Sequence, residues 1–460
     1  MRQVVRTLAV AAFLAPALLT GAVAQEAAAP AIIPEFPGQG RPVDIPATSG
    51  RRQRLMDRLG DAVVVIPAGH ERTGEAYGDY PQDTDFRQHN TFFYFTMLEQ
   101  AEAWLVLNAR TAGPDEALLL LPERNPMRER WVGVKIGPGE LATRLTGLPT
   151  LSNRKLDSVL TAATARGVPV YVQIDPTTRN EAVIQRLRAD SARVGLRNLR
   201  PVVDSMRLVK DAQEIAVLRR AVRISAEAHA DLMRDAREGM MEYELEAILE
   251  AGFRRRGGDR VGYPSIVGSG FNGTTLHYMD NRAPTHPGDL VVVDAAAEYA
   301  QYTADVTRTF PIGGRFTPRQ RAIYDLVLGT QQAAMDSVRP GMTMARLGQI
   351  ARDYMRANSG DLCGADSCLP YFIHGLGHWI GMDVHDVGPY AVPLAPGMVF
   401  TIEPGIYIPA ESLGVRIEDD VLVTETGYEL LSGAAPRRAE DIERLMATNR
   451  GGNAQRQRSR

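Results

Sequence analysis

The chain has 460 residues, a length that predicts two or three domains with substantial hydrophobic cores. Hydrophobic residues make up 44% and charged residues 23% of it, both ordinary values for a soluble globular protein. The formal net charge is -3 and neither sign forms a long block, so the composition excludes the electrostatic pattern of a nucleic-acid-binding protein.

The first 24 residues have the order of a cleavable secretory signal peptide. Arg2 and Arg6 precede the apolar run "TLAVAAFLAPALLT", and small residues follow in "AVAQ", which places cleavage after Ala24. The apolar run is too short for a comfortable membrane span. We therefore expect a periplasmic or secreted protein without membrane attachment after processing, with an uncleaved anchor as the alternative.

Residues 25–50 are rich in Ala, Pro and Gly, which predicts a linker or an extended arm. Residues 51–204 alternate short apolar runs with helical stretches, which predicts an α/β domain with a mostly parallel or mixed sheet. The predicted buried strands are "DAVVVIPA", "AEAWLVLNA", "EALLLLP" and "VPVYVQI".

A second domain is predicted over residues 205–446, and its first long helix begins with a capping box of Asp211 and Glu214. Two segments, which begin at Arg237 and Arg339, share spaced Arg, Gly, Met and Leu residues, and each predicts an amphipathic helix before a strand-forming stretch. They indicate a duplicated helix-plus-sheet module, with chance similarity as the alternative. The polar residues after 446 predict a disordered tail over 447–460.

The two cysteines, Cys363 and Cys368, lie in "DLCGADSC". In an exported protein such a pair favours a disulfide over a metal site, because two thiols cannot complete a four-ligand zinc site. We expect a local disulfide cross-link within a loop. Its entropic contribution to the stability of the fold would be modest, because the closed loop is short.

The stretch "LVVVDAAAEYAQYTADVTRTFPI" alternates as a β-hairpin does. A turn at Tyr299 and Ala300 would make Asp294 and Asp305 cross-strand neighbours, with Cβ atoms roughly 5 Å apart. Two ionised carboxylates at that distance repel each other, and a divalent cation would remove the repulsion. Aspartates exposed on the surface of a hairpin are the simpler alternative.

Further polar residues follow the hairpin. His374, His378 and His385 lie in "HGLGHWIGMDVHD", where glycines allow a ligand to approach the backbone closely. Glu403 ends an apolar strand in "TIEPGIYI", and Glu418 alternates with apolar residues in "GVRIEDDVLVT". A set of one imidazole and four carboxylates is typical of a site for a pair of hard divalent ions such as manganese. It is not typical of a zinc site, which is rich in thiol ligands.

In this order, the motifs resemble the aminopeptidase P and prolidase group of "pita-bread" metallopeptidases. "DTDFRQHNTFFYFTML" and "RERWVGVKIGPGE" are similar to the amino-terminal domain of aminopeptidase P, and "SMRLVKDAQEIAVLRRA" is similar to its joining helix. The resemblance covers about residues 51–440 and implies an α/β N-terminal domain followed by an α+β pita-bread catalytic domain with a pseudo-two-fold internal repeat.

The resemblance also implies two divalent metal ions, with manganese expected and zinc or cobalt as alternatives. Their ligands would be Asp294, Asp305, His378, Glu403 and Glu418. Asp305 and Glu418 would bridge the ions, and Glu403 would also accept a proton from a bridging water. The catalytic residues would be His277, His385 and Glu403, and the residues lining the substrate pocket would be His374 and Arg416.

Two departures from the family concern the hairpin. Ala296 and Gln301 stand where the family usually has glycine, which leaves the shape of the turn open because glycine supplies positive φ in hairpin turns.

The implied activity is hydrolysis of the first peptide bond of a peptide that has proline at its second position, by a dinuclear centre with a bridging hydroxide. The imide nitrogen must gain a proton to leave, and His277 is the candidate donor, although it could instead pack beneath Tyr278. The alternatives are a prolidase-like dipeptidase, then creatinase-like C–N hydrolysis, and, from another class, a metal-free binding module. A homo-oligomer is compatible with the sequence.

Overall fold

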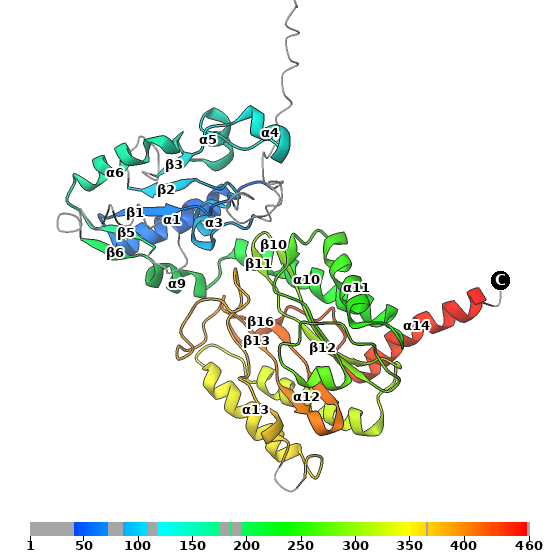
Figure 1. The fold of residues 1–460 in the computed structure, drawn as a ribbon. Helices are drawn as coiled ribbons and strands as arrows, with labels where there is room; N and C mark the ends of the chain where they lie inside the picture. Colours follow the sequence, from blue (N-terminus) through cyan, green and yellow to red (C-terminus); the bar gives the residue numbers. More distant parts are fainter. Residues whose placement is uncertain are drawn as a thin grey trace, which may run out of the picture.

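A computed structural model describes residues 41–71, 86–108, 117–173, 185, 187, 195–364 and 367–457, with side chains described up to 448. The predicted signal peptide and most of the predicted linker therefore lie outside the described residues. Figure 1 shows an N-terminal α/β domain beside a larger C-terminal domain, with helix α9 (Arg200–Leu208) where the two meet.

A six-stranded mixed sheet of order β4-β3-β2-β1-β5-β6 forms the centre of the N-terminal domain. Its strands are β1 (Val63–Pro67), β2 (Trp104–Leu107), β3 (Leu118–Leu121), β4 (Thr150–Ser152), β5 (Val170–Val172) and β6 (Leu196–Asn198). β1 pairs antiparallel with β2 and parallel with β5, and the four apolar runs all form strands of this sheet, which confirms the prediction. Its helices are α1 (Ile45–Leu59), α3 (Asn90–Thr96), α4 (Pro126–Val132), α5 (Glu140–Thr146) and α6 (Leu156–Thr164).

The structure differs from the predictions for the linker and for the disordered tail, because each of these ranges contains helical residues. Helix α1 begins at Ile45, inside the range predicted to be a linker, and the Asp44 side chain caps it by accepting a hydrogen bond from the Ala47 amide. Its proline stands in the first turn, where the missing N–H costs no helical hydrogen bond. The range predicted to be a disordered tail belongs for the most part to helix α14 (Ala439–Gln457).

Helix α10 (Ala212–Asp235) has the predicted capping box of Asp211 and Glu214. It packs against α11 (Glu242–Arg255), and α12 (Pro318–Met335) packs against α13 (Met344–Asn358) in the same way. Each pair is followed along the chain by a three-stranded antiparallel sheet, of order β12-β9-β8 in the first module and β13-β16-β17 in the second. This arrangement agrees with the duplicated module expected from the sequence.

The C-terminal domain buries its largest hydrophobic core between these helices and sheets. The strands of the first module are β7 (Arg260–Val261), β8 (Ile266–Ser269), β9 (Leu290–Asp294), β10 (Ala297–Tyr299), β11 (Tyr302–Thr303) and β12 (Thr307–Pro311). Those of the second are β13 (Val399–Ile402), β14 (Gly405–Ile408), β15 (Leu413–Arg416), β16 (Asp419–Val423) and β17 (Tyr428–Leu430). The two modules meet at an isolated antiparallel bridge between Thr307 and Glu418.

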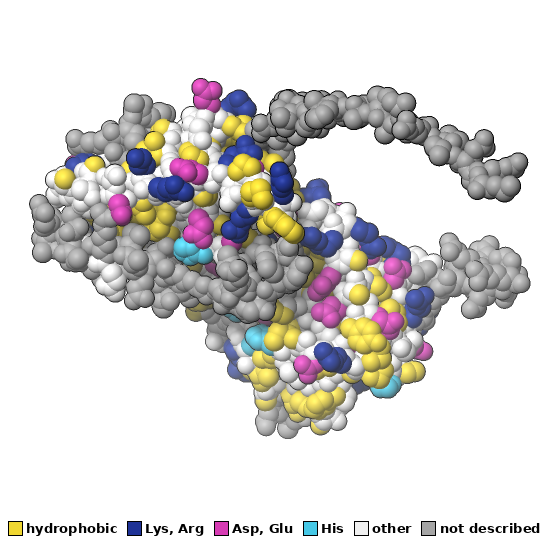
Figure 2. All heavy atoms as spheres, turned by 45° about the horizontal axis from the view of Figure 1, so that its top comes forward, with side chains coloured by type: hydrophobic (Ala, Val, Ile, Leu, Met, Phe, Trp, Pro, Cys, Tyr) yellow, Lys and Arg dark blue, Asp and Glu magenta, His cyan; other side chains and the backbone are white. Residues whose placement is uncertain are grey.

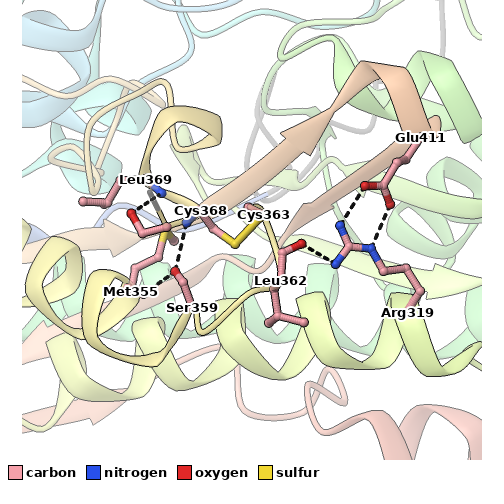
Figure 3. Close-up of a disulfide and its surroundings, with 9 residues drawn as sticks. Arg319, Met355, Ser359, Leu362, Cys363, Cys368, Leu369 and Glu411 are labelled. Atoms are coloured by element: carbon pink, nitrogen blue, oxygen red, sulfur yellow. Dashed lines mark hydrogen bonds and ion pairs between the residues drawn. A yellow bond between two sulfur atoms is a disulfide. The ribbon is translucent and has the colours of Figure 1, made fainter. Parts of the chain in front are cut away.

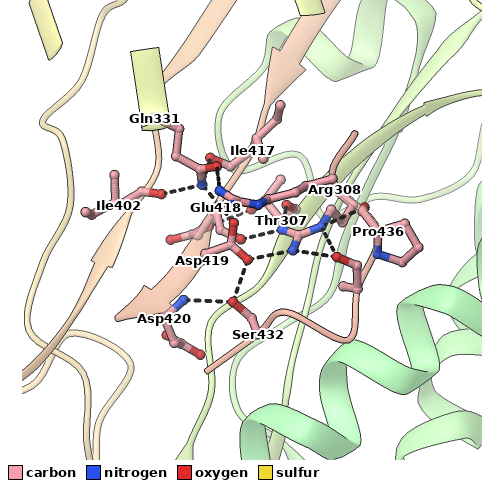
Figure 4. A network of polar contacts seen from close by, with 12 residues as sticks. Thr307, Arg308, Gln331, Ile402, Ile417, Glu418, Asp419, Asp420, Ser432 and Pro436 are labelled. Carbon is pink, nitrogen blue, oxygen red and sulfur yellow. Dashed lines mark hydrogen bonds and ion pairs between the residues drawn. The ribbon is translucent and has the colours of Figure 1, made fainter. Parts of the chain in front are cut away.

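A buried ion pair next to this bridge links strands of the two modules (Figure 4). Arg308 Nη2 donates to Asp419 Oδ1 at 2.6 Å, and both side chains are fully buried. Arg308 Nη1 donates to the backbone oxygen of Glu418 at 2.6 Å, while Gln331 Nε2 donates to the other oxygen of Asp419 at 2.9 Å. Because a buried charge is tolerated only when it is paired and hydrogen-bonded, the network holds β12 and β16 in one arrangement.

The expected disulfide between Cys363 and Cys368 is present in the loop after α13 (Figure 3). The Cys368 amide donates to Ser359 Oγ at 2.9 Å. Arg319 donates to the Leu362 oxygen and pairs with Glu411, so the loop is tied to α12 as well. The loop continues into the short helix η3 (Leu369–Tyr371) and then to the predicted pocket residues.

On the face shown in Figure 2, acidic and basic side chains are interspersed over both domains. In the part of the chain that the structure describes, no helix combines the length and apolarity needed to cross a bilayer.

Candidate active site

The two aspartates of the hairpin lie close together, although not in the predicted register. The turn falls at Ala300 and Gln301, one residue later than expected, and Asp294 therefore lies opposite Thr307 instead of Asp305. A turn displaced by one residue moves each cross-strand partner by two positions, which keeps a side chain on the same face. The aspartates therefore still meet, as diagonal neighbours.

The turn does not need the glycines that the family usually has. Ala300 and Gln301 both have positive φ, 48° and 65°, a combination typical of tight hairpin turns. Gln301 Nε2 donates to the Gln88 oxygen at 2.7 Å, and the Ala300 amide donates to Asp259 at 2.7 Å, so contacts outside the hairpin hold this conformation. Ala296 is fully buried and packs in a small apolar cluster.

A tyrosine hydroxyl lies between the two aspartates. The oxygen of Tyr263 is 2.6 Å from Oδ1 of Asp294 and 2.6 Å from Oδ1 of Asp305. A hydroxyl has one proton to donate, so it can satisfy only one of the two carboxylates. Burial and the two carboxylates raise the pKa of Tyr263 well above its usual value, which keeps it a donor.

Three of the predicted ligands form a compact group. One ligand atom from each of Asp305, His378 and Glu418 lies within 4.8 Å of the other two. His378 Nε2 is 3.3 Å from Asp305 Oδ2 and 3.6 Å from Glu403 Oε1. His378 Nδ1 donates to the Trp379 oxygen at 3.1 Å, which directs Nε2 at the carboxylates, where it would bind an ion once its proton is lost.

The remaining carboxylates are positioned by the ends of strands. Glu403 follows β13, and its amide donates to the Leu376 oxygen at 2.8 Å. Glu418 stands between β15 and β16, where it accepts a hydrogen bond of 2.6 Å from Thr307 Oγ1. Asp294 pairs with Arg416 Nη2 at 2.7 Å. All four predicted carboxylates therefore line one cavity together with His378.

The electrostatics of this group fit divalent cations. Burial and neighbouring carboxylates raise the pKa of Asp305, raise that of Glu403 to about 7 and raise that of Glu418 well above its usual value. Burial alone would lower the pKa of His378, but Asp305 and Glu403 raise it to about 9. Oxygen donors with one imidazole suit hard divalent ions, and the cysteines are held in the disulfide elsewhere. The residues present therefore fit a metal centre.

The cavity above this group has a volume of about 470 Å³. Its walls include all the residues that the sequence assigned to the substrate side: His277, His374, His385 and Arg416. The rings of His385 and His378 stack, with centroids 3.9 Å apart. Burial is the main cause that lowers the pKa of His374 to about 4, and the charge of Arg416 adds to it. Burial is also the main cause that lowers the pKa of His385, and the charge of His378 adds to it. Both histidines are therefore neutral near pH 7.

Arg416 lines the cavity as predicted, but its side chain is largely engaged by other groups of the protein. It is only 3% exposed, and its nitrogens donate to Asp294, Tyr407 and Thr307 and to the Leu276 oxygen. These bonds use four of the five N–H donors of the guanidinium and pair it with Asp294, which leaves little of its charge for a substrate carboxylate. His374 Nε2 accepts a hydrogen bond from the Tyr407 hydroxyl at 2.9 Å, and its Nδ1 donates to the Gly375 oxygen.

Sequence reasoning missed several residues of the site, among them Tyr263, Thr307 and Tyr407. Tyr407 lies in "TIEPGIYI" at a period-two spacing from Glu403, and Thr307 lies in the hairpin at the same kind of spacing from Asp305. Because this spacing places side chains on one face of a strand, both residues were detectable from the sequence. Tyr263 precedes β8 in an ordinary loop, and nothing in its local sequence marks it.

Comparisons with known proteins agree with this geometry. Residues 216–425 match the model of metallopeptidase family M24, and residues 48–171 match that of the aminopeptidase P N-terminal domain. The chain is 36% identical to the Xaa-Pro aminopeptidase of Escherichia coli over 433 residues, which cover 87% of this chain and 97% of the relative. The chain belongs to the aminopeptidase P family.

Solved structures of this family have the same fold. Aminopeptidase P from E. coli with the inhibitor Pro-Leu aligns with a TM-score of 0.80 at 35% identity, over 89% of this chain and 100% of that chain. Proline aminopeptidase P II from Yersinia pestis aligns with a TM-score of 0.78 at 36% identity, over 88% and 99%. The expected architecture, an aminopeptidase P N-terminal domain followed by a pita-bread domain, is confirmed, and the protein is a metal-dependent hydrolase.

Proposed function

We propose that this aminopeptidase P family member is an exported Xaa-Pro aminopeptidase with a dinuclear metal centre. The observation that carries the proposal is the meeting of four carboxylates and His378 at the base of one cavity whose walls hold three further histidines. Asp294, Asp305, His378, Glu403 and Glu418 would hold the ions. Two bound ions would activate a shared water and polarise the scissile carbonyl.

The residues of the chain supply the proton transfers in this proposal. Glu403 lines the cavity beside His378, with its Oε1 3.6 Å from His378 Nε2, where a carboxylate could accept a proton from the water and later release it. The imide nitrogen before proline has no hydrogen and must be protonated to leave. His277 and His385 line the cavity from two separate loops, and His277, directly or through water, would deliver that proton.

Cleavage of longer peptides is favoured over cleavage of dipeptides alone. A dipeptidase needs a cation for the carboxylate of its substrate, and the guanidinium of Arg416 is already engaged by Asp294 and Tyr407. The inhibitor of the related E. coli enzyme, Pro-Leu, has the composition left when the first residue is cut from Xaa-Pro-Leu. A prolidase-like activity is the second candidate, because Arg416 lines the same cavity.

The metal and the location are also proposals. Manganese suits a centre of four carboxylates and one imidazole, and zinc or cobalt would be accepted by the same donors. The order of charged, apolar and small residues in residues 1–24 supports export to the periplasm or beyond.

One set of measurements tests the function. The purified protein is incubated with Ala-Pro-Ala and with Ala-Pro after metal removal and after addition of Mn²⁺, Zn²⁺ or Co²⁺, and its metal content is counted. We expect about two ions per chain, release of Ala from the tripeptide, and no activity of Asp305→Asn. Full activity of the metal-free protein would refute the mechanism, and cleavage of the dipeptide alone would favour the prolidase-like alternative. An unprocessed N-terminus on protein from the cytoplasm would argue against export.

A further inference from the structure

The cavity wall that carries His385 is held by the connection between the two domains and by residues of the N-terminal domain. His385 belongs to the segment Gly381–Asp386, which forms a loop after the ligand His378. Its own side chain is exposed, and its ring has the stacking contact with His378. Apart from this stacking, an exposed ring at the end of a loop is placed by the residues that hold the loop.

Asp386, the residue after His385, is the buried anchor of this loop. Lys210 Nζ donates to Asp386 Oδ2 at 3.2 Å and Arg207 Nη2 donates to Oδ1 at 2.5 Å. The side chains of Lys210 and Asp386 are each 1% exposed. Burial opposes ionisation of the carboxyl, but the two cations hold the pKa of Asp386 below its usual value. The carboxylate is therefore charged and bound on both oxygens.

The two cations come from the connection between the domains. Arg207 lies in the last turn of α9, and Lys210 lies in the short link between α9 and α10. The N-terminal domain adds two further contacts to the loop: Asn90 Nδ2 donates to Asp383 at 2.7 Å, and Arg87 donates to the Met382 oxygen at 2.5 Å. The loop with His385 is thus held by residues far from it in the chain.

The fit around this anchor is tight. A Cβ on Gly381 would lie 2.2 Å from Asp386 Oδ2 and 3.2 Å from Lys210 Cε. Glycine at this position therefore lets the start of the loop pack directly on the ion pair. The Asp386 amide donates to the Trp379 oxygen at 2.9 Å, which fixes the end of the loop against the backbone next to His378.

From these contacts we propose that Lys210 and Arg207 are positioning residues: through Asp386, the connection between the domains sets the place of His385 in the cavity. The kinetic part of this inference rests on the proposed peptidase function. An ion pair of this kind is worth little for stability compared with well-packed apolar residues, so a positioning role explains its presence better than a stabilising one.

Lys210→Met is the informative variant, because Asp386 keeps Arg207 as a partner and is not left as an unpaired buried charge. We expect kcat/KM for an Xaa-Pro peptide to fall about tenfold, as for residues that orient a group in a site. Lys210→Arg, which keeps a cation there, retains most of the activity. In the His385→Ala background, Lys210→Met lowers kcat/KM by less than about twofold, because residues that act as one unit are not additive.

Arg51→Met is the matched control. Arg51 is a buried cation of the N-terminal domain that pairs with Asp211 at the start of α10 and lies 3.9 Å from the buried Glu214. In its absence Asp211 keeps Arg54 as a partner, and Glu214 keeps its hydrogen bonds from the Asp211 amide and the Tyr302 hydroxyl. The loss of Arg51 weakens the contact between the domains without touching the loop. We expect Arg51→Met to lower the stability of the protein and to leave kcat/KM within about twofold of wild type. In the His385→Ala background, Arg51→Met should change kcat/KM by the same factor as it does in the wild-type background.

A second readout does not depend on catalysis. Amide hydrogen exchange of residues 381–386 becomes at least about fivefold faster in Lys210→Met and stays unchanged in Arg51→Met. If the wild-type protein fails to cleave Xaa-Pro peptides, the proposed function is refuted, while the exchange result still decides the anchoring of the loop. Unchanged exchange, or an effect of Lys210→Met that is fully retained without His385, would overturn the positioning role.

Discussion

Thr307 and Glu418 join the two modules of the catalytic domain at the proposed metal centre. Their backbones form the isolated bridge between the two sheets, and Thr307 Oγ1 donates to Glu418 Oε2 at 2.6 Å. A proposed ligand from one module is thus oriented by a hydroxyl from the other. Hydrogen bonds of this kind fix the direction of a ligand and raise metal affinity.

We expect Thr307→Val, which keeps the shape and removes the hydroxyl, to lower metal affinity about 10-fold to 100-fold. Isothermal titration of the metal-free protein with Mn²⁺ measures the change. Thr330→Val is the control, because Thr330 is also fully buried but donates to the Leu326 oxygen within α12. An equal loss of affinity in both variants would show that the effect is one of general stability.

Stability at acid pH depends on His229. Burial, the main cause, lowers the pKa of His229 to about 4 from an ordinary value of 6.5, and its Nε2 donates to the Ala295 oxygen at 2.8 Å. The folded protein therefore binds fewer protons at this site than the unfolded chain does. The stability contributed by the neutral ring is complete above pH 6.5 and is lost as the pH falls towards about 4, by on the order of 3 kcal/mol.

His229→Gln tests this dependence, because a glutamine amide can still donate to Ala295 but does not titrate. We expect the variant to show a smaller loss of unfolding free energy between pH 7 and pH 4.5 than wild type does, measured by urea denaturation. His286→Gln, at an exposed position, is expected to follow the wild-type curve. A parallel pair of curves for wild type and His229→Gln would contradict the assignment.

Glu242 holds the segment that carries His277. Its fully buried carboxylate accepts hydrogen bonds from the Ser269 amide, Asn272 Nδ2, the Tyr278 hydroxyl and the Ala283 amide. In Glu242→Gln, an amide NH₂ would face two of these donors. We expect kcat/KM to fall about tenfold or more and the protein to lose about 1–3 kcal/mol of stability.

The matched control for Glu242 lies on the same helix. Glu250 accepts one hydrogen bond, from Ser265 Oγ, so Glu250→Gln should change kcat/KM by less than about twofold. Peptide kinetics with thermal denaturation measure both effects. Normal kinetics of a folded Glu242→Gln variant would refute the role of Glu242 in placing His277.

The disulfide is expected to add stability without taking part in chemistry. Its loop closes over a sequence separation of 5, for which the chain-entropy model gives about 2 kcal/mol. Reduction, or replacement of Cys363 and Cys368 by serine, should lower the unfolding free energy by about that amount and leave the metal content unchanged. The serine variant should also become insensitive to a reducing agent. A loss of bound metal on reduction would contradict a purely structural role.

Most elements could be predicted from local sequence because their cause is local. Apolar runs mark the buried strands, Asp211 and Glu214 mark the start of α10, and the residue types of the five ligands mark a site for hard cations. The hairpin register was wrong by one turn residue, because positive φ at Ala300 and Gln301 is stabilised by contacts with Asp259 and Gln88. Local turn chemistry cannot reveal such distant contacts.

The sequence by itself determined which chemical groups this protein brings to its site: four carboxylates and several histidines, in an order that identifies the family. Only the tertiary structure decided how those groups are held. Tyr263 lies between Asp294 and Asp305, and Lys210 pairs with Asp386 across 176 residues of chain. Propensity and periodicity describe neighbours along the chain, whereas a buried ion pair or a shared hydroxyl depends on which distant surfaces pack together.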